Sequence, residues 1–448
     1  MGTGVRELVT AAPQHHRWQV ILRGVQIAST CALIPILLVR QLWSLRGADA
    51  RGVRALGRVA VRVCTRLGAT FIKVGQIAST RGDILPRPFA QELTALQDQV
   101  PPFPFATVRA TIEQELGKPL EQVYAHFDVE PVAAASVAQV HRAVLRSTGE
   151  TVAVKVRRPD ILQKVQLDRA VLLFIARRLE RLVPSLRLVS LEVAMQNFCL
   201  AVEQQIHLTN EAEHNRRFTA NFASDPDIHF PRLVPEACSD AVLTMEFIEG
   251  IREPDLEAHG ADLRAIVDAG MRCVCRMIFS HGFVHADLHP GNMRFLLPGR
   301  VVLLDLGLVG QLSETDRLMT AQTLFAFATG DGRTVARLFY ENAPYKAVAD
   351  YAAYEAEIVA LVDRLRHRDL KTSQVTMDVG RIFDLLRRHR IQARGHMTMI
   401  NLALMTAEGL GKRLDPSLSI ADATLPYLAE VVAPSSVAPL PVPPVPDT

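Results

Sequence analysis

The sequence has little net charge and few cysteines. Its 448 residues carry a formal net charge of only +3, which is too small to suggest a nucleic-acid-binding protein. Of the six cysteines, only Cys273 and Cys275 lie close together, and a C-x-C pair within a helix points its thiols to different faces. Neither a zinc knuckle nor a disulfide is therefore expected, and we predict a reduced, cytosolic protein with no nucleic-acid partner.

A cleavable signal peptide is also missing, because the first apolar run begins late and no small-residue cleavage site follows it. That run, residues 24–39, is mostly apolar and is bounded by arginines, and the only two tryptophans, Trp18 and Trp43, flank it. A spanning helix needs about 20 apolar residues, so this run is marginal. A spanning anchor, an interfacial helix and a plain packed helix all stay open.

Positive charge is concentrated at the front of the chain. Residues 1–66 hold ten arginines against only Glu7 and Asp49. A basic segment around an apolar run suggests an anionic bilayer surface. We therefore expect the protein on the cytoplasmic side of a membrane, in a bacterial cytoplasm, as a peripheral protein or with a single N-terminal anchor.

Hydrophobic periodicity predicts helices, then a small sheet, then more helices. With 49% apolar residues the chain can bury a large core in two or three subdomains. Residues 132–145 and 151–156 are strand-like and joined by a turn, which predicts a hairpin. The other predicted elements are helices at 51–99, 105–117, 160–182, 190–222, 261–281 and 313–432, strands at 241–250, 293–296 and 301–304, and a disordered Pro-rich tail from 434.

The loop HADLHPGN, residues 285–292, precedes a buried strand that ends in Asp305-Leu306-Gly307. Phosphoryl transfer needs a carboxylate that orients or deprotonates a nucleophile, together with oxygen ligands for Mg²⁺. Asp287 is the candidate for the first role, and Asn292 and Asp305 are candidates for the second. We expect Gly307 to let the backbone turn sharply at the metal.

Lys155 lies in the apolar strand VAVKV, where a charge is costly unless it is paired. Lysine is scarce in this chain, so its presence here hints that a compact ammonium is required. We expect an acidic partner, for which Glu211 on a following helix is the best candidate. The ammonium would then hold the phosphates of a nucleotide.

Together these segments resemble the UbiB/AarF/ADCK-type atypical kinases, a KxGQ-containing family associated with ubiquinone biosynthesis. The resemblance covers roughly residues 60–432, and several motifs occur in the family's order. The matching segments are FIKVGQIASTRGDILP (71–86), which is similar to the KxGQ segment, LQDQVPP (96–102), the Ala-rich loop AAASVAQV (133–140), and the catalytic and metal loops HADLHPGN and DLG.

The resemblance implies an α+β, two-lobed, protein-kinase-like fold, with an N-terminal helical extension packed over the active site. It also implies ATP and Mg²⁺ as cofactors. The corresponding divisions are a membrane-anchor or interfacial helix at 1–50, the helical extension at 51–130, an N-lobe with inserted helices at 131–250, a helical C-lobe at 251–432, and the tail at 433–448.

Individual roles follow from the same resemblance. Lys73 and Gln76, on one helix face, would lie over the active site. Asp287 and Lys155 would be catalytic, and Asn292 and Asp305 would bind the metal. The nucleotide would be contacted by Ala133, Ala134, Ala135, Ser136, Val137, Ala138, Gln139 and Val140 of the Ala-rich loop, by Lys155 with its partner Glu211, by Lys73 and Gln76, and by Met245, Glu246 and Phe247 of an adenine-binding hinge.

The chain departs from the family pattern at several positions. Gln205 and His207 stand where the family has an acidic ExD pair, so an ion pair to the first acid cannot form, although Gln205 could still hydrogen-bond an ammonium. Leu288 and Gly82 each replace a usual proline, and Leu306 replaces a phenylalanine. None of these three supplies a ligand.

Proteins are not the expected substrate. Only five residues separate Gly307 from a helix predicted to start at Ser313, where Asp316 completes a capping-box-like S-x-x-D. A peptide-binding activation segment does not fit in this connection.

Three functions are compared. The favoured one is an ATP-binding atypical kinase or ATPase that acts on or for a membrane-associated lipid or quinone precursor. The second is a nucleotide-switched, pseudokinase-like scaffold that organises a complex of biosynthetic enzymes at a membrane. The third is a zinc hydrolase built on His281, His285 and His289, against which Pro290-Gly291 argues, because it interrupts a helix. We expect His285 and His289 to bond backbone groups instead.

Overall fold

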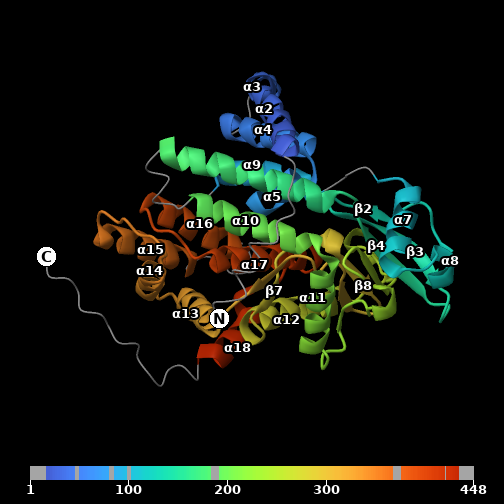
Figure 1. Cartoon of the computed structure of the whole chain (residues 1–448). Helices are drawn as coiled ribbons and strands as arrows, with labels where there is room; N and C mark the ends of the chain where they lie inside the picture. Colours follow the sequence, from blue (N-terminus) through green and yellow to red (C-terminus); the bar gives the residue numbers. More distant parts are fainter. Residues whose placement is uncertain are drawn as a thin grey trace. The chain divides into compact units, whose positions relative to one another are not determined.

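The structure, a computed structural model, contains both helices and β-sheets (Figure 1). It forms two compact units, the first from the described parts of Met1–Ser79, Arg87–Thr209 and Pro235–Thr244, and the second from those of Thr80–Pro86, Asn210–Val234 and Met245–Thr448. Gly82 and the predicted tail lie outside the described residues. The described residues are 17–45, 50–79, 85–97, 102–182, 191–366, 375–418 and 420–432.

The first unit begins with helices. The chain leaves α4 at Gly68, whose φ of +96° is one that a residue with a side chain rarely adopts, and α5 begins one residue later. These elements are α2 (Arg17–Ala32), α3 (Ile34–Ser44), α4 (Arg51–Leu67), α5 (Ala69–Ser79), α6 (Arg87–Leu93), the 3₁₀-helix η1 (Thr94–Gln97), α7 (Phe105–Leu116) and α8 (Leu120–Val123).

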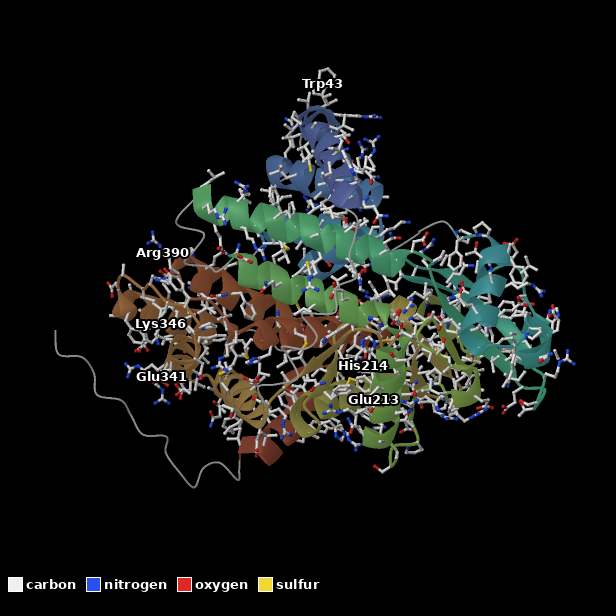
Figure 2. All side chains as sticks on the ribbon, viewed as in Figure 1. Trp43, Glu213, His214, Glu341, Lys346 and Arg390 are labelled. Carbon is white, nitrogen blue, oxygen red and sulfur yellow. The ribbon has the colours of Figure 1, made fainter. Side chains whose placement is uncertain are left out.

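Together α2 and α3 make a longer apolar segment than the run predicted from the sequence. Trp18–Ser44 is long and apolar enough to cross a membrane, judged by length and composition alone. The two helices are separated at Leu33, and Pro35 lies in the first turn of α3. Trp18 is 73% and Trp43 66% exposed, and Figure 2 shows Trp43 projecting from α3.

The inner face of α2 packs against the rest of the first unit. Arg23 donates hydrogen bonds to both carboxylate oxygens of the buried Asp168 on α9, at 2.6 and 3.1 Å. It also donates to the carbonyl of Leu67 at 2.6 Å, where α4 ends. Ile27 packs with Leu67 and Phe71. One face of α2 is thus docked, while its exposed side chains are largely apolar.

The sheet of the first unit confirms the predicted hairpin. Its strand order is β1-β3-β4-β6, with β2 paired to β3. The residues before the hairpin, predicted as part of one long strand, instead form a separate short strand and a tight turn. The strands are β1 (Tyr124–Phe127), β2 (Ala133–Ala134), β3 (Ala138–Leu145), β4 (Thr151–Arg157) and β6 (Val242–Glu246).

The long helix predicted at 190–222 is interrupted, and this prediction is corrected. α9 (Ile161–Leu182) is followed by α10 (Leu191–Ile206) and then by α11 (Leu208–Asn221). At the break, the His207 ring lies 2.9 Å from each carboxylate oxygen of Asp240. The Thr209 hydroxyl donates to the same carboxylate at 3.0 Å. Asp240, distant in sequence, therefore holds both sides of the break.

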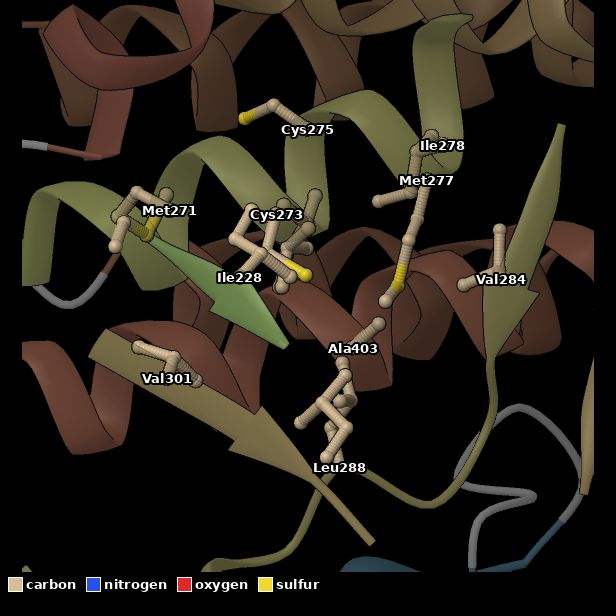
Figure 3. Close-up of a cluster of buried hydrophobic side chains, with 14 of the residues drawn as sticks. Ile228, Met271, Cys273, Cys275, Met277, Ile278, Val284, Leu288, Val301 and Ala403 are labelled. Atoms are coloured by element: carbon tan, nitrogen blue, oxygen red, sulfur yellow. The ribbon is translucent and has the colours of Figure 1, made fainter. Parts of the chain in front are cut away.

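A large apolar core organises the second unit. α12 (Leu263–Cys275) continues as the π-helical turn η6 (Arg276–Ser280), and both are largely buried. Figure 3 shows Met271, Cys273 and Met277 of this segment together with Val301 and Ala403. The two neighbouring cysteines are buried and free, as expected from their spacing.

The second unit has short strands and a series of helices. Its sheets have the orders β5-β9-β8 and β10-β7. Periodicity predicted β8, β9 and the helices but not the two- and three-residue strands. The strands are β5 (Ile228–His229), β7 (Phe283–His285), β8 (Met293–Leu296), β9 (Arg300–Leu303) and β10 (Val309–Gln311), and the helices after them are α13 (Glu314–Thr329), α14 (Gly332–Glu341), α15 (Tyr351–Arg366), α16 (Val375–Arg388), α17 (Gly395–Leu414) and α18 (Ile420–Val432).

Candidate nucleotide and metal site

Two antiparallel pairings bring the predicted catalytic and metal loops together within the second unit. β7 pairs with β10, and the Ala286 N–H donates to the Leu308 carbonyl at 3.0 Å. β8 pairs with β9, and the Leu304 N–H donates to the Asn292 carbonyl at 2.9 Å. The backbone segments that carry Asp287, Asn292 and Asp305 are therefore neighbours.

His285 joins these loops from inside the core. Its Nε2 lies 2.5 Å from the Asp305 carbonyl oxygen, and its Nδ1 accepts the Asp287 N–H at 3.0 Å. An acceptor at Nδ1 and a carbonyl at Nε2 require the neutral ring with its proton on Nε2. Burial lowers the pKa of His285, which agrees with this neutral form. The expectation that His285 bonds backbone groups is confirmed.

The rest of the loop is held by its own residues. His289 Nδ1 accepts the Gly291 N–H at 3.1 Å, so this histidine also bonds the backbone, as expected. The Asn292 amide nitrogen donates to the Asp287 carbonyl at 3.0 Å. This bond fixes the amide and leaves its oxygen as the atom suited to a cation.

Gly307 lies at a bend in the backbone and also allows a close approach of side chains. Its N–H donates to Asp305 Oδ1 at 3.0 Å. A Cβ at this position would lie 3.2 Å from that oxygen and 3.7 Å from Glu211 Oε2. Gly307 is not among the glycines with positive φ, but the backbone bends at this residue, which agrees with the predicted turn. Glu211 is itself buried beside Asp305 and Gly307, at 4% exposure.

The donors in this cluster suit Mg²⁺ better than zinc. Within the described residues, no three or more His, Cys, Asp or Glu side chains form a group that could hold a metal ion. Mg²⁺ does not need one, because it is bound by one or two carboxylates together with phosphate oxygens and water. Asp305 and Asn292 fit that chemistry. Both nitrogens of His285 bond backbone groups, so the three-histidine zinc site is excluded.

His214 is a bracing residue that the sequence analysis missed. Its Nδ1 lies 2.9 Å from the Leu306 carbonyl oxygen, and its ring packs against Phe283. Burial lowers its pKa. Figure 2 labels it on α11, next to Glu213. Its spacing of i+3 from Glu211 places both on one helix face, and this spacing was the available signal.

In the first unit, strand register places Lys155 beside the Ala-rich loop. Val140 pairs with Lys155 on β4 and with Ala133 on β2. Directly opposed residues of antiparallel strands point to the same face. Ala133, Val140 and Lys155 therefore share one face of the sheet. The pairing of Lys155 with Glu211 stays a prediction.

Gln139 faces the other side. Its side chain is 1% exposed and accepts the Phe103 N–H at 2.8 Å. Its amide nitrogen donates to the Phe103 carbonyl at 3.3 Å and lies 2.8 Å from His141 Nε2. These bonds use both amide hydrogens and hold the oxygen at Phe103, on the face away from Lys155, so the predicted nucleotide contact of Gln139 would come from its backbone.

The tip of the Ala-rich loop is a tight turn. The Ala135 N–H donates to the Ala138 carbonyl at 2.8 Å, and Arg158 Nε donates to the Ala135 carbonyl at 3.0 Å. Ala133 and Ala135 are exposed, and Ser136 is buried. The loop therefore offers small side chains and backbone outward, which suits a cover over a ligand.

The KxGQ residues lie on α5. Lys73 is half-buried, and Gln76 donates to the Leu96 carbonyl at 3.0 Å, which ties α5 to η1. Gln205 Oε1 is buried and has no hydrogen-bond partner among the described residues. The bond to an ammonium that Gln205 could provide is thus not formed, and Lys73 is not restrained by it.

The predicted hinge covers the last two residues of β6, Met245 and Glu246, and the next residue, Phe247. The Glu246 N–H donates to the Arg232 carbonyl at 2.8 Å. The Glu246 carboxylate lies 2.9 Å from His229 Nε2 and accepts the Arg232 N–H at 3.1 Å. Met245 is buried, and Phe247 is half-buried. The Glu246 side chain is therefore committed to the protein, and adenine contacts from this segment stay a prediction.

The short connection after Gly307 consists of a β-strand and the start of a helix. β10 occupies Val309–Gln311, and the Leu312 N–H donates to the Gly282 carbonyl at 2.8 Å. α13 then starts with the predicted capping box of Ser313 and Asp316. No peptide-binding activation segment occupies this part of the described chain.

Comparison with known proteins identifies two family models. Residues 95–339 match the ABC1 atypical kinase-like domain, and residues 358–419 match the UbiB helical domain. Curated proteins named probable protein kinase UbiB are similar over most of the chain. The one from Pseudomonas fluorescens is 35% identical over 369 residues, covering 81% of this chain and 69% of that protein. The one from Azotobacter vinelandii is 35% identical over 404 residues, covering 89% and 74%.

Among solved structures, a Mycobacterium tuberculosis protein in complex with erythromycin has a similar fold. The TM-score is 0.54 at 20% identity, and the match covers 82% of this chain and 92% of that protein. At this identity the likeness bears on the fold alone. With the family models, it confirms the predicted kinase-like α+β fold.

Proposed function

Because this chain belongs to the UbiB-related family of ABC1 atypical kinase-like proteins, we propose that it binds ATP with Mg²⁺. We infer that it acts as an atypical kinase or ATPase, on or for a membrane-associated small molecule of isoprenoid quinone biosynthesis. The main support is the cluster in the second unit, where buried His285 bonds both the Asp287 N–H and the Asp305 carbonyl. Such a fixed array of oxygen donors suits phosphoryl transfer, which depends mostly on positioning.

The four key residues would have different roles in this reaction. Asp305 and the Asn292 amide oxygen would hold Mg²⁺, which neutralises charge on the phosphates when it is bound. Asp287 would orient or deprotonate the attacking hydroxyl or water. Lys155 would bind the α- and β-phosphates from the sheet face that it shares with Ala133.

We propose an interfacial rather than a spanning role for the N-terminal apolar segment. Arg23 is bonded to Asp168 and to the Leu67 carbonyl, so α2 is docked by one face. Pulling α2 across a bilayer would break a buried ion pair, which is strongly unfavourable. The exposed Trp18 and Trp43 are residue types that favour the membrane interface. The protein would thus lie on the cytoplasmic side of the membrane.

Nucleotide binding with and without Mg²⁺ tests the proposal. Calorimetry of the full chain in detergent should give ATP affinity that rises with Mg²⁺. Asp305→Asn should abolish that dependence and leave weak, metal-independent binding. Asp363→Asn, a matched change on α15, should behave as wild type. Equal Mg²⁺ dependence in Asp305→Asn would contradict the metal role. Nucleotide binding without any turnover, with lipid and a quinone-precursor phenol present, would favour the scaffold.

A further inference from the structure

A hollow of about 400 Å³ lies within the first unit, bordered by α2, α4, α5, η1, the start of α9 and the Ala-rich loop. Three cations line it, Arg23, Arg158 and Lys164. Among the described lining residues the one carboxylate, Asp168, is already paired with Arg23 on both oxygens. Burial lowers the pKa of Arg158, so this guanidinium is partly desolvated. The described lining of the hollow therefore carries an excess of positive charge.

Two buried hydroxyls also line the hollow. Thr70 is 5% and Ser136 is 6% exposed. Within the described part of the chain, neither hydroxyl has a hydrogen-bond partner, whereas Thr65 in the same wall donates to the Val61 carbonyl at 2.9 Å. Neither oxygen is among the fully enclosed polar atoms that lack a partner, so both hydroxyls are accessible from the hollow and can donate to water or a ligand there.

Two helices begin at the same hollow. α5, of 11 residues, starts at Ala69, and α9, of 22 residues, starts at Ile161. Both first residues line the hollow. The first N–H groups of a helix have no acceptor within that helix, and the helix dipole favours an anion there. Hydroxyls, cations and helix N-termini thus converge on one space.

We propose that this hollow is a binding site for a phosphate-bearing anion, distinct from the ATP phosphates, and this proposal assigns the Ser136 side chain to that anion rather than to the nucleotide. Thr70 and Ser136 would donate hydrogen bonds to its oxygens, and Arg158 and Lys164 would balance its charge. Arg23 holds α2 in the wall. The phosphate could belong to a phospholipid headgroup, since α2 bears exposed apolar residues, or to a soluble phosphate ester. Both sources offer the same chemistry to these residues.

Binding assays on the full chain in non-ionic detergent test this site. Inorganic phosphate is titrated by calorimetry, and vesicles of phosphatidylcholine are compared in flotation with vesicles that also contain phosphatidylglycerol. Thr70→Val, which keeps the shape, and Lys164→Gln, at an exposed position, should each weaken phosphate binding about tenfold. Lys164→Arg should retain binding. Lys118→Gln, an exposed matched change away from the hollow, should match wild type.

The outcomes separate the two sources. Loss of phosphatidylglycerol-dependent flotation in Thr70→Val and Lys164→Gln supports the site with a lipid headgroup as its occupant. Variant-sensitive binding of inorganic phosphate, with flotation unchanged, supports the site with a soluble occupant. If both variants equal wild type in both assays, or if Lys118→Gln loses as much as Lys164→Gln, the site is rejected. Neither Thr70 nor Lys164 belongs to the predicted nucleotide site, so failure here leaves the ATP proposal standing.

Discussion

Each unit holds one predicted motif in place with a buried histidine, but the two histidines use opposite tautomers. In the first unit, His141 Nδ1 lies 2.8 Å from the Asp128 carbonyl oxygen, and its Nε2 accepts from the Gln139 amide at 2.8 Å. In the second unit, His285 Nε2 bonds the Asp305 carbonyl and Nδ1 accepts from the Asp287 N–H. Both rings are fully buried and neutral. His141 braces a strand next to the Ala-rich loop, and His285 braces the predicted catalytic loop itself.

The two histidines differ in how directly they contact the proposed metal-binding and catalytic residues. His285 bonds the backbone of two residues that we assign to metal and catalysis. His141 acts one step further away, through Gln139 and Phe103. A change at His285 should therefore affect activity and stability together, whereas a change at His141 should affect mainly stability.

The largest effect is expected at Asp287, whose loop His285 holds. Asp287→Asn keeps the size and the backbone bonds but removes the proposed general base, so ATP turnover should fall about 10³-fold. Binding of MgATP and the free energy of unfolding should stay close to wild type. Steady-state ATPase assays with lipid present measure the first, and calorimetry and urea titration measure the others. Unchanged turnover would remove Asp287 from the mechanism.

Replacing His285 should come next. His285→Leu leaves the Asp287 N–H and the Asp305 carbonyl unpaired in the core, which should cost about 3 kcal/mol of unfolding free energy. His285→Asn can keep an acceptor near Nδ1, and His285→Gln a donor near Nε2, so each should recover part of the loss. Urea titration gives the stabilities. If His285→Leu lost stability but kept full turnover, the claim that His285 supports activity more directly than His141 would be wrong.

The matching change in the first unit should be smaller. His141→Leu should cost about 2 kcal/mol, because the Asp128 carbonyl and one Gln139 N–H lose their partner. His141→Asn can restore a donor to Asp128. Turnover at saturating MgATP should be retained in both variants under conditions where they are folded. A fall in turnover as large as in His285→Leu would mean that the two histidines do not differ in role.

The residues with chemical character were predictable, and their supports were mostly not. HADLHPGN and DLG are local strings, so the two loops could be singled out in advance, although the roles of Asp287, Asn292 and Asp305 stay predictions. The Gly307–Ser313 connection with its capping box was predicted correctly. The break at His207 could not be predicted, because Asp240, which holds it, is distant in sequence.

The side-chain partners of Gln139 could not be predicted for the same reason. Its position in the Ala-rich loop suggested a nucleotide contact, whereas its partners, Phe103 and His141, depend on how the sheet packs. Strands as short as β7 and β10 carry too few residues for periodicity to detect. Tertiary hydrogen bonds, rather than local pattern, decide these features.

The smallest expected effect is on how folding stability depends on pH. It tests whether His141, like His285, stays neutral in the folded protein. Burial lowers the pKa of His141, partly offset by the Asp128 carbonyl and by the charges of Asp128 and Glu130. Above the unfolded pKa of about 6.5, the ring is neutral in both states and its contribution is complete. As the pH falls below that value, the unfolded chain binds a proton that the folded chain excludes, so stability decreases by at most about 1.4 kcal/mol per pH unit. The other buried histidines, His285 among them, have lowered pKa values too and remain in His141→Asn. The difference in stability between wild type and His141→Asn at each pH therefore isolates His141.

Urea titrations of both proteins from pH 8 to 5 should give a constant difference in stability above about pH 6.5 and a shrinking difference below it. A difference that stays constant throughout would mean that His141 accepts its proton in the folded state.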